Sequence, residues 1–276
     1  MDLFSKLENT ADFIRQKTNG FEPVLGMILG TGLSNFTQHL EIKSSISYKE
    51  IPGFAESTVD GHKGELICAE YKGLKMLVMS GRFHYYEGYS MDQVTFPVRV
   101  MKFLGIQKLI ISNAAGGVQA HIYPGDLVFI RDHINLLPEN PLRGQNDERI
   151  GLRFPDMLNT YNREWNKKAL SIAKKKNIRA HEGVYVATQG PNLETPAEYR
   201  FFNIIGGDVV GMSTIPEVLA AKHMNLPVFV ISVVSNRCFP IEELTETSLE
   251  EVLQVVNAAE KDLTAIMLSL LTEIQR

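Results

Sequence analysis

The sequence predicts an α/β protein in which a central β-sheet is covered by helices on both faces. Short apolar segments of strand length alternate with longer segments of helical periodicity along most of the 276 residues. Hydrophobic residues make up 44% of the chain and charged residues 22%, which is usual for a protein with a large buried core. No linker, internal repeat or low-complexity stretch divides the chain, so we expect residues 1–276 to form a single domain.

Seven apolar segments rich in Val, Ile, Leu and Met are predicted to be buried strands, and they span residues 23–29, 74–79, 108–112, 127–131, 183–187, 208–212 and 227–234. Six segments with apolar residues at helical spacing are predicted to be helices, and they span residues 2–18, 92–104, 158–177, 195–205, 215–225 and 248–273. The longest polar interruption covers residues 138–156. A loop of this length is expected to have a function or to pack against a neighbouring molecule.

Charge and cysteine content exclude several classes of protein. The net charge is −4, which does not favour a nucleic-acid-binding or anionic-membrane surface. Cys68 and Cys238 are too few for a disulfide framework or a cysteine-based metal site, and we expect both thiols to be buried and inert. The seven histidines are scattered without metal-ligand spacing, so no metal is expected. The polar N-terminus and the lack of a long apolar run predict a cytoplasmic protein.

Two glycine-containing segments follow predicted strands. Gly30-Thr31-Gly32 would let an anion approach the main chain, and the Thr31 hydroxyl could donate to that anion. Asn35 stands where a dinucleotide-binding fingerprint has its third glycine, and a plain tight turn fits the segment equally well. In residues 113–117, the main-chain N–H groups around Ala114 could point at a ligand, or the small residues could serve packing alone.

The segment 81–89 combines a cation, a histidine and a carboxylate after another predicted strand. Arg82 offers a planar fork of donors suited to phosphate. His84 can donate a hydrogen bond, and Glu87 could fix the tautomer of its ring. An aromatic-rich packing loop is the alternative, and the density of polar groups makes it the weaker interpretation.

Three further residues, Glu194, Ser213 and Asn236, also lie just beyond predicted strands. On local grounds Glu194 reads as a carboxylate at a helix start, Ser213 as a helix cap and Asn236 as a strand end. The carboxyl ends of strands meet at one edge of a sheet, however, so all five segments are expected to share one cleft. They would supply an anion cradle (Thr31, Arg82, His84, Ser213 and main-chain N–H near Ala114) and a carboxylate–amide pair (Glu194 and Asn236).

The residue chemistry points to a phosphate-using enzyme with a planar polar substrate. No nucleophile elbow of the G-x-S-x-G kind is present, so a bound anion would itself be the attacking group. The segments LGTGL, GRFHYYEGY, NAAGG, GPNLETPAEYR and VGMSTIPEV occur in this order between about residues 20 and 240. They resemble the signatures of the purine nucleoside phosphorylases, and in particular of the trimeric branch that prefers 6-oxopurine nucleosides.

The resemblance implies a mixed-sheet α/β fold, a homotrimer and no cofactor besides the co-substrate phosphate. It implies phosphorolysis of inosine, guanosine or their deoxy forms to a free base and (deoxy)ribose 1-phosphate. The implied phosphate contacts are Thr31, Arg82, His84, Ala114 and Ser213, the ribose contacts are Tyr86, Met212 and a neighbouring subunit's Phe154, and the purine contacts are Glu194 and Asn236. Asn236, Glu194 and His84 are the implied catalytic residues.

Two positions depart from the family pattern. Leu193 stands where the common vertebrate form has Phe, and Leu249 stands about where a histidine reaches the ribose 5′-hydroxyl. An apolar wall there would favour an apolar 5′ substituent, which keeps a methylthioadenosine phosphorylase as the nearest alternative. Asn236 argues against it, since those enzymes tend to carry Asp at that place. A dinucleotide-binding protein and a non-catalytic purine-binding protein are further alternatives.

Overall fold

The computed structural model describes residues 1–56 and 64–275. Its α-helices are α1 (Leu3–Lys17), α2 (Met91–Phe103), α3 (Arg163–Lys176), α4 (Pro196–Ile204), α5 (Ile215–His223) and α6 (Leu249–Ile274). Its strands are β1 (Leu25–Leu29), β2 (Glu41–Ser47), β3 (Glu65–Tyr71), β4 (Leu74–Ser80), β5 (Lys108–Gly117), β6 (Leu127–Asn135), β7 (Ala180–Ala187), β8 (Val209–Gly211) and β9 (Val228–Arg237). Short 3₁₀ helices are η1 (Ser34–His39), η2 (Tyr48–Glu50), η3 (Tyr85–Glu87) and η4 (Ile241–Glu243).

The strands form one mixed sheet in the order β2-β3-β4-β1-β5-β8-β7-β6-β9. β5 also pairs in parallel with β9 along most of its length, so β5, β8, β7, β6 and β9 close into a ring. The sheet combines parallel pairs (β1 with β4 and β5) and antiparallel pairs (β2 with β3, β6 with β9). The mixed sheet implied by the family resemblance is confirmed.

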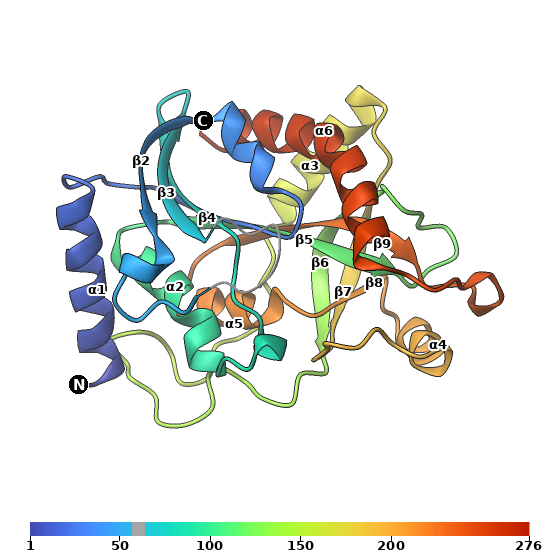
Figure 1. The fold of residues 1–276 in the computed structure, drawn as a ribbon, viewed down its shortest axis with the longest axis horizontal. Helices are drawn as coiled ribbons and strands as arrows, with labels where there is room; N and C mark the ends of the chain where they lie inside the picture. Colours follow the sequence, from blue (N-terminus) through green and yellow to red (C-terminus); the bar gives the residue numbers. More distant parts are fainter. Residues whose placement is uncertain (57–63, 276) are drawn as a thin grey trace.

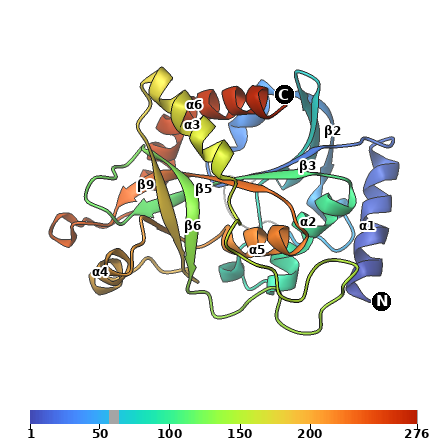
Figure 2. The ribbon, with the colours of Figure 1, turned by 180° about the vertical axis from the view of Figure 1, so that it is seen from behind.

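Helices cover both faces of this sheet (Figures 1 and 2). α3 and α6 pack on one face, where Trp165, Leu263 and Met267 join the inner side chains of β1 and β9. α1, α2 and α5 pack on the other face. Each face therefore buries its own hydrophobic core, as the alternation of elements predicts.

The six predicted helices and seven predicted strands are all present. The helix expected over 158–177 begins later, at Arg163, because the Asn162 side chain caps it by accepting from the N–H groups of Glu164 and Trp165. Strands β2 and β3 were not predicted. β2 is an edge strand with the polar sequence EIKSSIS, and most of its residues are exposed, so it lacks the apolar signal of the inner strands.

The strand expected to end at residue 112 continues to Gly117, so residues 113–117 are not a loop. Their small size is explained by close packing. A Cβ atom on Gly116 would lie 2.5 Å from the Cys238 sulfur of β9's continuation. The small residues thus let β5 pair with β8 and β9 at the point where the ring closes.

Candidate active site

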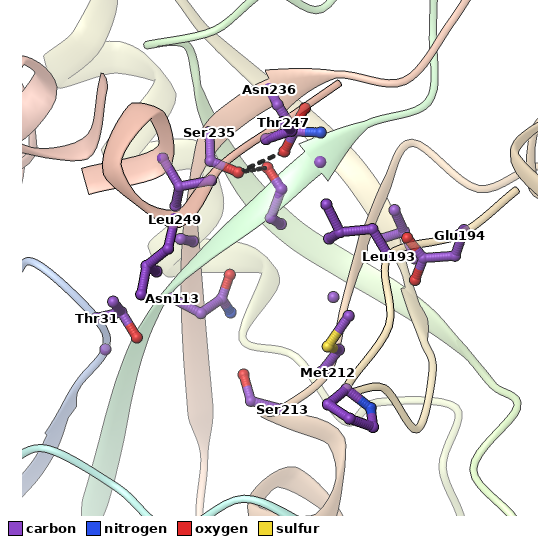
Figure 3. Close-up of a pocket in the computed structure, with 18 of the residues that line it drawn as sticks. Thr31, Asn113, Leu193, Glu194, Met212, Ser213, Ser235, Asn236, Thr247 and Leu249 are labelled. Atoms are coloured by element: carbon purple, nitrogen blue, oxygen red, sulfur yellow. Dashed lines mark hydrogen bonds between the residues drawn. The ribbon is translucent and has the colours of Figure 1, made fainter. Parts of the chain in front are cut away.

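A cavity of about 360 Å³ opens where β1, β4, β5, β8 and β9 end, and the start of α6 closes one side of it. Its lining includes nine of the ten predicted site residues: Thr31, Arg82, His84, Tyr86, Ala114, Glu194, Met212, Ser213 and Asn236. Thr31 and Ser213 lie at one side of the cavity, whereas Asn236 and Glu194 lie at the other (Figure 3). The tenth residue, Phe154, is not part of this lining and is 86% exposed.

Arg82 is the buried anchor of one side, with only 1% of its surface exposed. Its Nη1 donates to the hydroxyls of Ser213 (3.1 Å) and Thr214 (2.9 Å), and its Nη2 donates to the Ser112 carbonyl. The Glu217 carboxylate lies 3.7 Å from Nη1 and is also buried. A buried guanidinium needs such a partner charge, so Glu217 and the hydroxyls fix Arg82 in place.

Thr214, which contacts Arg82, has a strained backbone conformation. Its φ is +73°, an unusual value for a β-branched residue. Its hydroxyl accepts from both Arg82 and the Asn113 amide (2.9 Å each). Strain of this kind persists where the surroundings over-determine the geometry, which is common in functional sites.

Sequence reasoning missed Thr214, Asn113 and the role of Glu217. The local interpretation of Ser213 as a helix cap is wrong: Thr214 is the N-cap of α5, without a side-chain capping bond, and Ser213 binds Arg82. Glu217 did carry a signal, because it is the only acidic residue within the largely buried helix Ile215–His223. A carboxylate in such a helix needs a buried partner.

His84 is oriented by Glu87, as the sequence predicts. The ring Nδ1 lies 2.9 Å from the Glu87 carboxylate, which also accepts from the His84 main-chain N–H. The carboxylate favours a proton on Nδ1, so Nε2 can accept from a ligand hydroxyl when the ring is neutral and donate to a ligand oxygen when it is charged. The ring stacks on Tyr86 with 4.7 Å between centroids, and burial raises the pKa of Tyr86 to about 12, which keeps its hydroxyl protonated.

Glu194 and Asn236 occupy the other side of the cavity. The Thr188 hydroxyl donates to Glu194 Oε1 (2.8 Å). Thr195 and Glu198 form the capping box of α4, and Glu194 directly precedes it at the helix start, as its local sequence suggests, while also lining the cavity. The Ser235 hydroxyl donates to Asn236 Oδ1 (2.7 Å), and Asn236 Nδ2 donates to the Cys238 sulfur (3.2 Å).

Both cysteines are buried free thiols, as predicted. Burial raises the pKa of Cys68 and raises that of Cys238 to about 12, so both stay protonated. Cys238 nevertheless lines the cavity, together with Tyr199, and neither was expected there. Leu193 and Leu249 also line it, and both are about half exposed (Figure 3).

Across residues 1–56 and 64–275, no group of three or more His, Cys, Asp or Glu side chains is placed to hold a metal ion. Nor does the described part of the chain contain a helix long and apolar enough to cross a membrane. The cavity itself is lined by hydroxyl, guanidinium, imidazole, amide and carboxylate groups.

Comparison with known proteins places this geometry in a family. Residues 25–272 match the model of the phosphorylase superfamily. Purine nucleoside phosphorylase 1 of Geobacillus stearothermophilus is 47% identical over 254 residues, covering 91% of this chain and 92% of the relative. The chain belongs to the phosphorylase superfamily and, within it, to the purine nucleoside phosphorylases.

Solved structures agree with this assignment. Isoform 2 of purine nucleoside phosphorylase from Schistosoma mansoni, in complex with cytosine and ribose-1-phosphate, superposes with a TM-score of 0.92 at 37% identity, covering 98% of this chain and 96% of that one. A schistosoma purine nucleoside phosphorylase in complex with hypoxanthine superposes with a TM-score of 0.89 at 39% identity, covering 97% of this chain and 96% of that one.

Proposed function

We propose that the cavity binds a 6-oxopurine nucleoside beside inorganic phosphate and catalyses phosphorolysis of the N-glycosidic bond. The products are a free purine, from inosine or guanosine, and ribose or deoxyribose 1-phosphate. One observation carries the proposal: a cradle of buried donors around Arg82 and a carboxylate–amide pair line the same cavity. The whole of residues 1–276 would serve this function as one domain.

Phosphate is held by the cradle and is the nucleophile. Arg82, His84, Ser213 and Thr31, which line the cavity, contact its oxygens together with main-chain N–H at Ala114. Alignment with the anomeric carbon turns a bimolecular step into a local one. Attack from the face opposite the base inverts the anomeric centre, and the phosphate charge stabilises the oxocarbenium character that develops on the ribose.

The base is held by Glu194 and Asn236. The Asn236 amide N–H donates to N7 or O6 as the purine departs with negative charge, which makes this contact strongest in the transition state. Glu194 accepts from N1–H. Adenine presents a bare N1 and an exocyclic donor instead, so its binding would leave buried groups unpaired.

The ribose lies between these two sides, with Tyr86 and Met212 beside it. We assign the remaining contact to Phe154 of a neighbouring subunit in a homotrimer. Phe154 is 86% exposed and shares its loop with exposed Leu152 and Leu158, an arrangement that suits burial against another copy.

A complementary apolar surface lies on α4, next to the cavity. Phe201 and Ile204 are exposed there, and half-exposed Leu193, shortly before α4 in the chain, lines the cavity. The loop of Phe154 extends beneath α5 towards α1, away from α4 (Figures 1 and 2). A contact between these two different surfaces would be head-to-tail, the kind that closes into a ring.

The two buried free thiols support a cytoplasmic location, because reducing compartments keep thiols free. We propose phosphate as co-substrate and no cofactor.

One observation favours a second candidate, methylthioadenosine phosphorolysis. Leu249 lines the cavity near Thr31 (Figure 3), where it would leave a 5′-hydroxyl without a partner and suit an apolar 5′ group. Asn236 favours the 6-oxopurine reaction.

The test is purine release from inosine, guanosine, adenosine and methylthioadenosine, each with and without phosphate. Phosphate-dependent cleavage of inosine and guanosine alone is expected. Cleavage of methylthioadenosine in preference would mean that the apolar 5′ wall outweighs the Glu194 and Asn236 contacts. Release that does not need phosphate would refute phosphorolysis.

A further inference from the structure

A layer of polar side chains lies directly behind the purine-binding pair. The Thr188 hydroxyl donates to Glu194 Oε1 at 2.8 Å, and Asn236 Nδ2 donates to Cys238 Sγ at 3.2 Å. The Tyr199 hydroxyl interacts with both the Glu194 carboxylate and the Cys238 thiol. These contacts form a continuous chain from Thr188 to Asn236 that joins the two groups expected to recognise the base.

The middle of this chain is set in an apolar environment. Tyr199 is 6% exposed and Cys238 is 1% exposed, and both belong to a small hydrophobic cluster with Val118, Val186 and Phe202. Buried polar groups cost free energy unless they are hydrogen-bonded. Phe and Val would fill the same space without that cost, so the hydroxyl and the thiol need a role beyond packing.

Their partners suggest the role. The Thr188 hydroxyl donates to Glu194 Oε1 and so fixes the orientation of the carboxylate, a group that only accepts hydrogen bonds. An acceptor matches N1–H of a 6-oxopurine and not the bare N1 of a 6-aminopurine. At Asn236, Ser235 holds Oδ1 and the Cys238 sulfur takes one Nδ2 hydrogen. The other Nδ2 hydrogen is then directed to the base.

Resting on the proposed function, we propose that Thr188, Tyr199 and Cys238 are positioning residues that hold Glu194 as an acceptor and aim the Asn236 amide. They thereby set the preference for 6-oxopurine over 6-aminopurine nucleosides. The preference between the two kinds of base is thus determined by these residues as well as by Glu194 and Asn236, which contact the base.

The experiment measures kcat and KM of full-length enzyme for inosine and adenosine, together with the KM for phosphate. Tyr199→Phe and Thr188→Val should each lower the inosine-to-adenosine ratio of kcat/KM roughly tenfold or more, since each removes a hydroxyl that interacts with the Glu194 carboxylate. Thr188→Ser keeps the hydroxyl and should keep the ratio. The phosphate KM should not change in any of these variants.

The thiol is tested at the other end of the chain. Cys238→Val should lower kcat for inosine about tenfold by leaving the Asn236 amide without its partner, whereas Cys238→Ser should retain most of it. Tyr161→Phe is the matched control, because it removes an equally buried hydroxyl, bonded to His133, outside the cavity. Its inosine-to-adenosine ratio should equal that of the wild type.

Two results would overturn the inference. One is an unchanged inosine-to-adenosine ratio in Tyr199→Phe and Thr188→Val. The other is an equal loss on both nucleosides with a raised phosphate KM, which a general structural defect produces. Thermal unfolding checks that each variant folds. If one of Tyr199→Phe and Thr188→Val does not fold, the other alone decides the test. Wild-type enzyme without phosphate-dependent inosine cleavage would instead refute the proposed function, and the inference with it.

Discussion

The buried pair of Arg82 and Glu217 allows a quantitative prediction about the proposed phosphate cradle. Glu217→Ala removes the carboxylate 3.7 Å from Arg82 Nη1 and leaves the guanidinium buried. With an effective dielectric constant near 20, the lost attraction is about 4 kcal/mol, within the range measured when one partner of a buried pair is deleted. For a chain of this length that corresponds to a fall in melting temperature of about 7 °C.

The assay is thermal unfolding with and without saturating phosphate. Because bound phosphate supplies a new negative partner for Arg82, it should raise the melting temperature of Glu217→Ala more than that of the wild type. Glu164→Ala, which breaks an exposed pair with Lys168, is the control and should cost at most about 1 kcal/mol. A melting temperature within about 1 °C of the wild type, or equal stabilisation of both proteins by phosphate, would refute this account of Arg82.

Four further outcomes are expected. Asn236→Ala should lower kcat for inosine roughly 100-fold, as loss of a transition-state donor does, with the phosphate KM unchanged; an unaltered kcat would exclude the leaving-group role. Arg82→Ala should raise the phosphate KM at least about tenfold in a phosphate titration, and an unchanged dependence would remove Arg82 from the cradle. Leu249→His should raise the preference for inosine over 5′-deoxyinosine several-fold in kcat/KM, and equal ratios would show that Leu249 does not face the 5′ position. Burial, and secondarily the charge of Arg99, lower the pKa of His223 to about 4. The unfolded chain therefore binds the proton first, and the free energy of unfolding falls as the pH drops from about 6.5 towards 4. His223→Gln should weaken this fall in thermal melts at pH 7 and pH 5, and an identical pH dependence would contradict the prediction.

The fold was predictable where an element carries its own hydrophobic pattern. The inner strands are apolar throughout, and the helices show one apolar face, so their positions follow from the sequence alone. β2 was not found because an exposed edge strand has little apolar pattern. The extension of β5 to Gly117 was hidden because small residues after a strand resemble a loop, and only the approach of β9 explains them.

The site was predictable as a set of residue types after strands, but not as a set of contacts. Arg82 meets Thr214 across 132 residues of sequence, and this bond depends on the close approach of β4 and the start of α5. Local reasoning places Glu194 at a helix start, which is where it lies, but does not show that its carboxylate also lines the cavity. Thr188 and Tyr199 carry no local signal, because a threonine near a strand end and a tyrosine in a short helix are ordinary residues until the carboxylate between them is located.

The charges around the cradle bear on how the reaction is driven. Arg82 faces Glu217 and His84 faces Glu87, so each cationic or protonatable donor is matched by a buried carboxylate. The cradle therefore offers directed hydrogen bonds with little net positive charge. A cluster of unpaired cations would bind phosphate more tightly in the ground state, but it would also neutralise the charge that stabilises the ribosyl cation. In the proposed reaction, donors without excess charge would hold the nucleophile in line and leave its negative charge to act on the transition state, while the neutral Asn236 amide would stabilise the departing base.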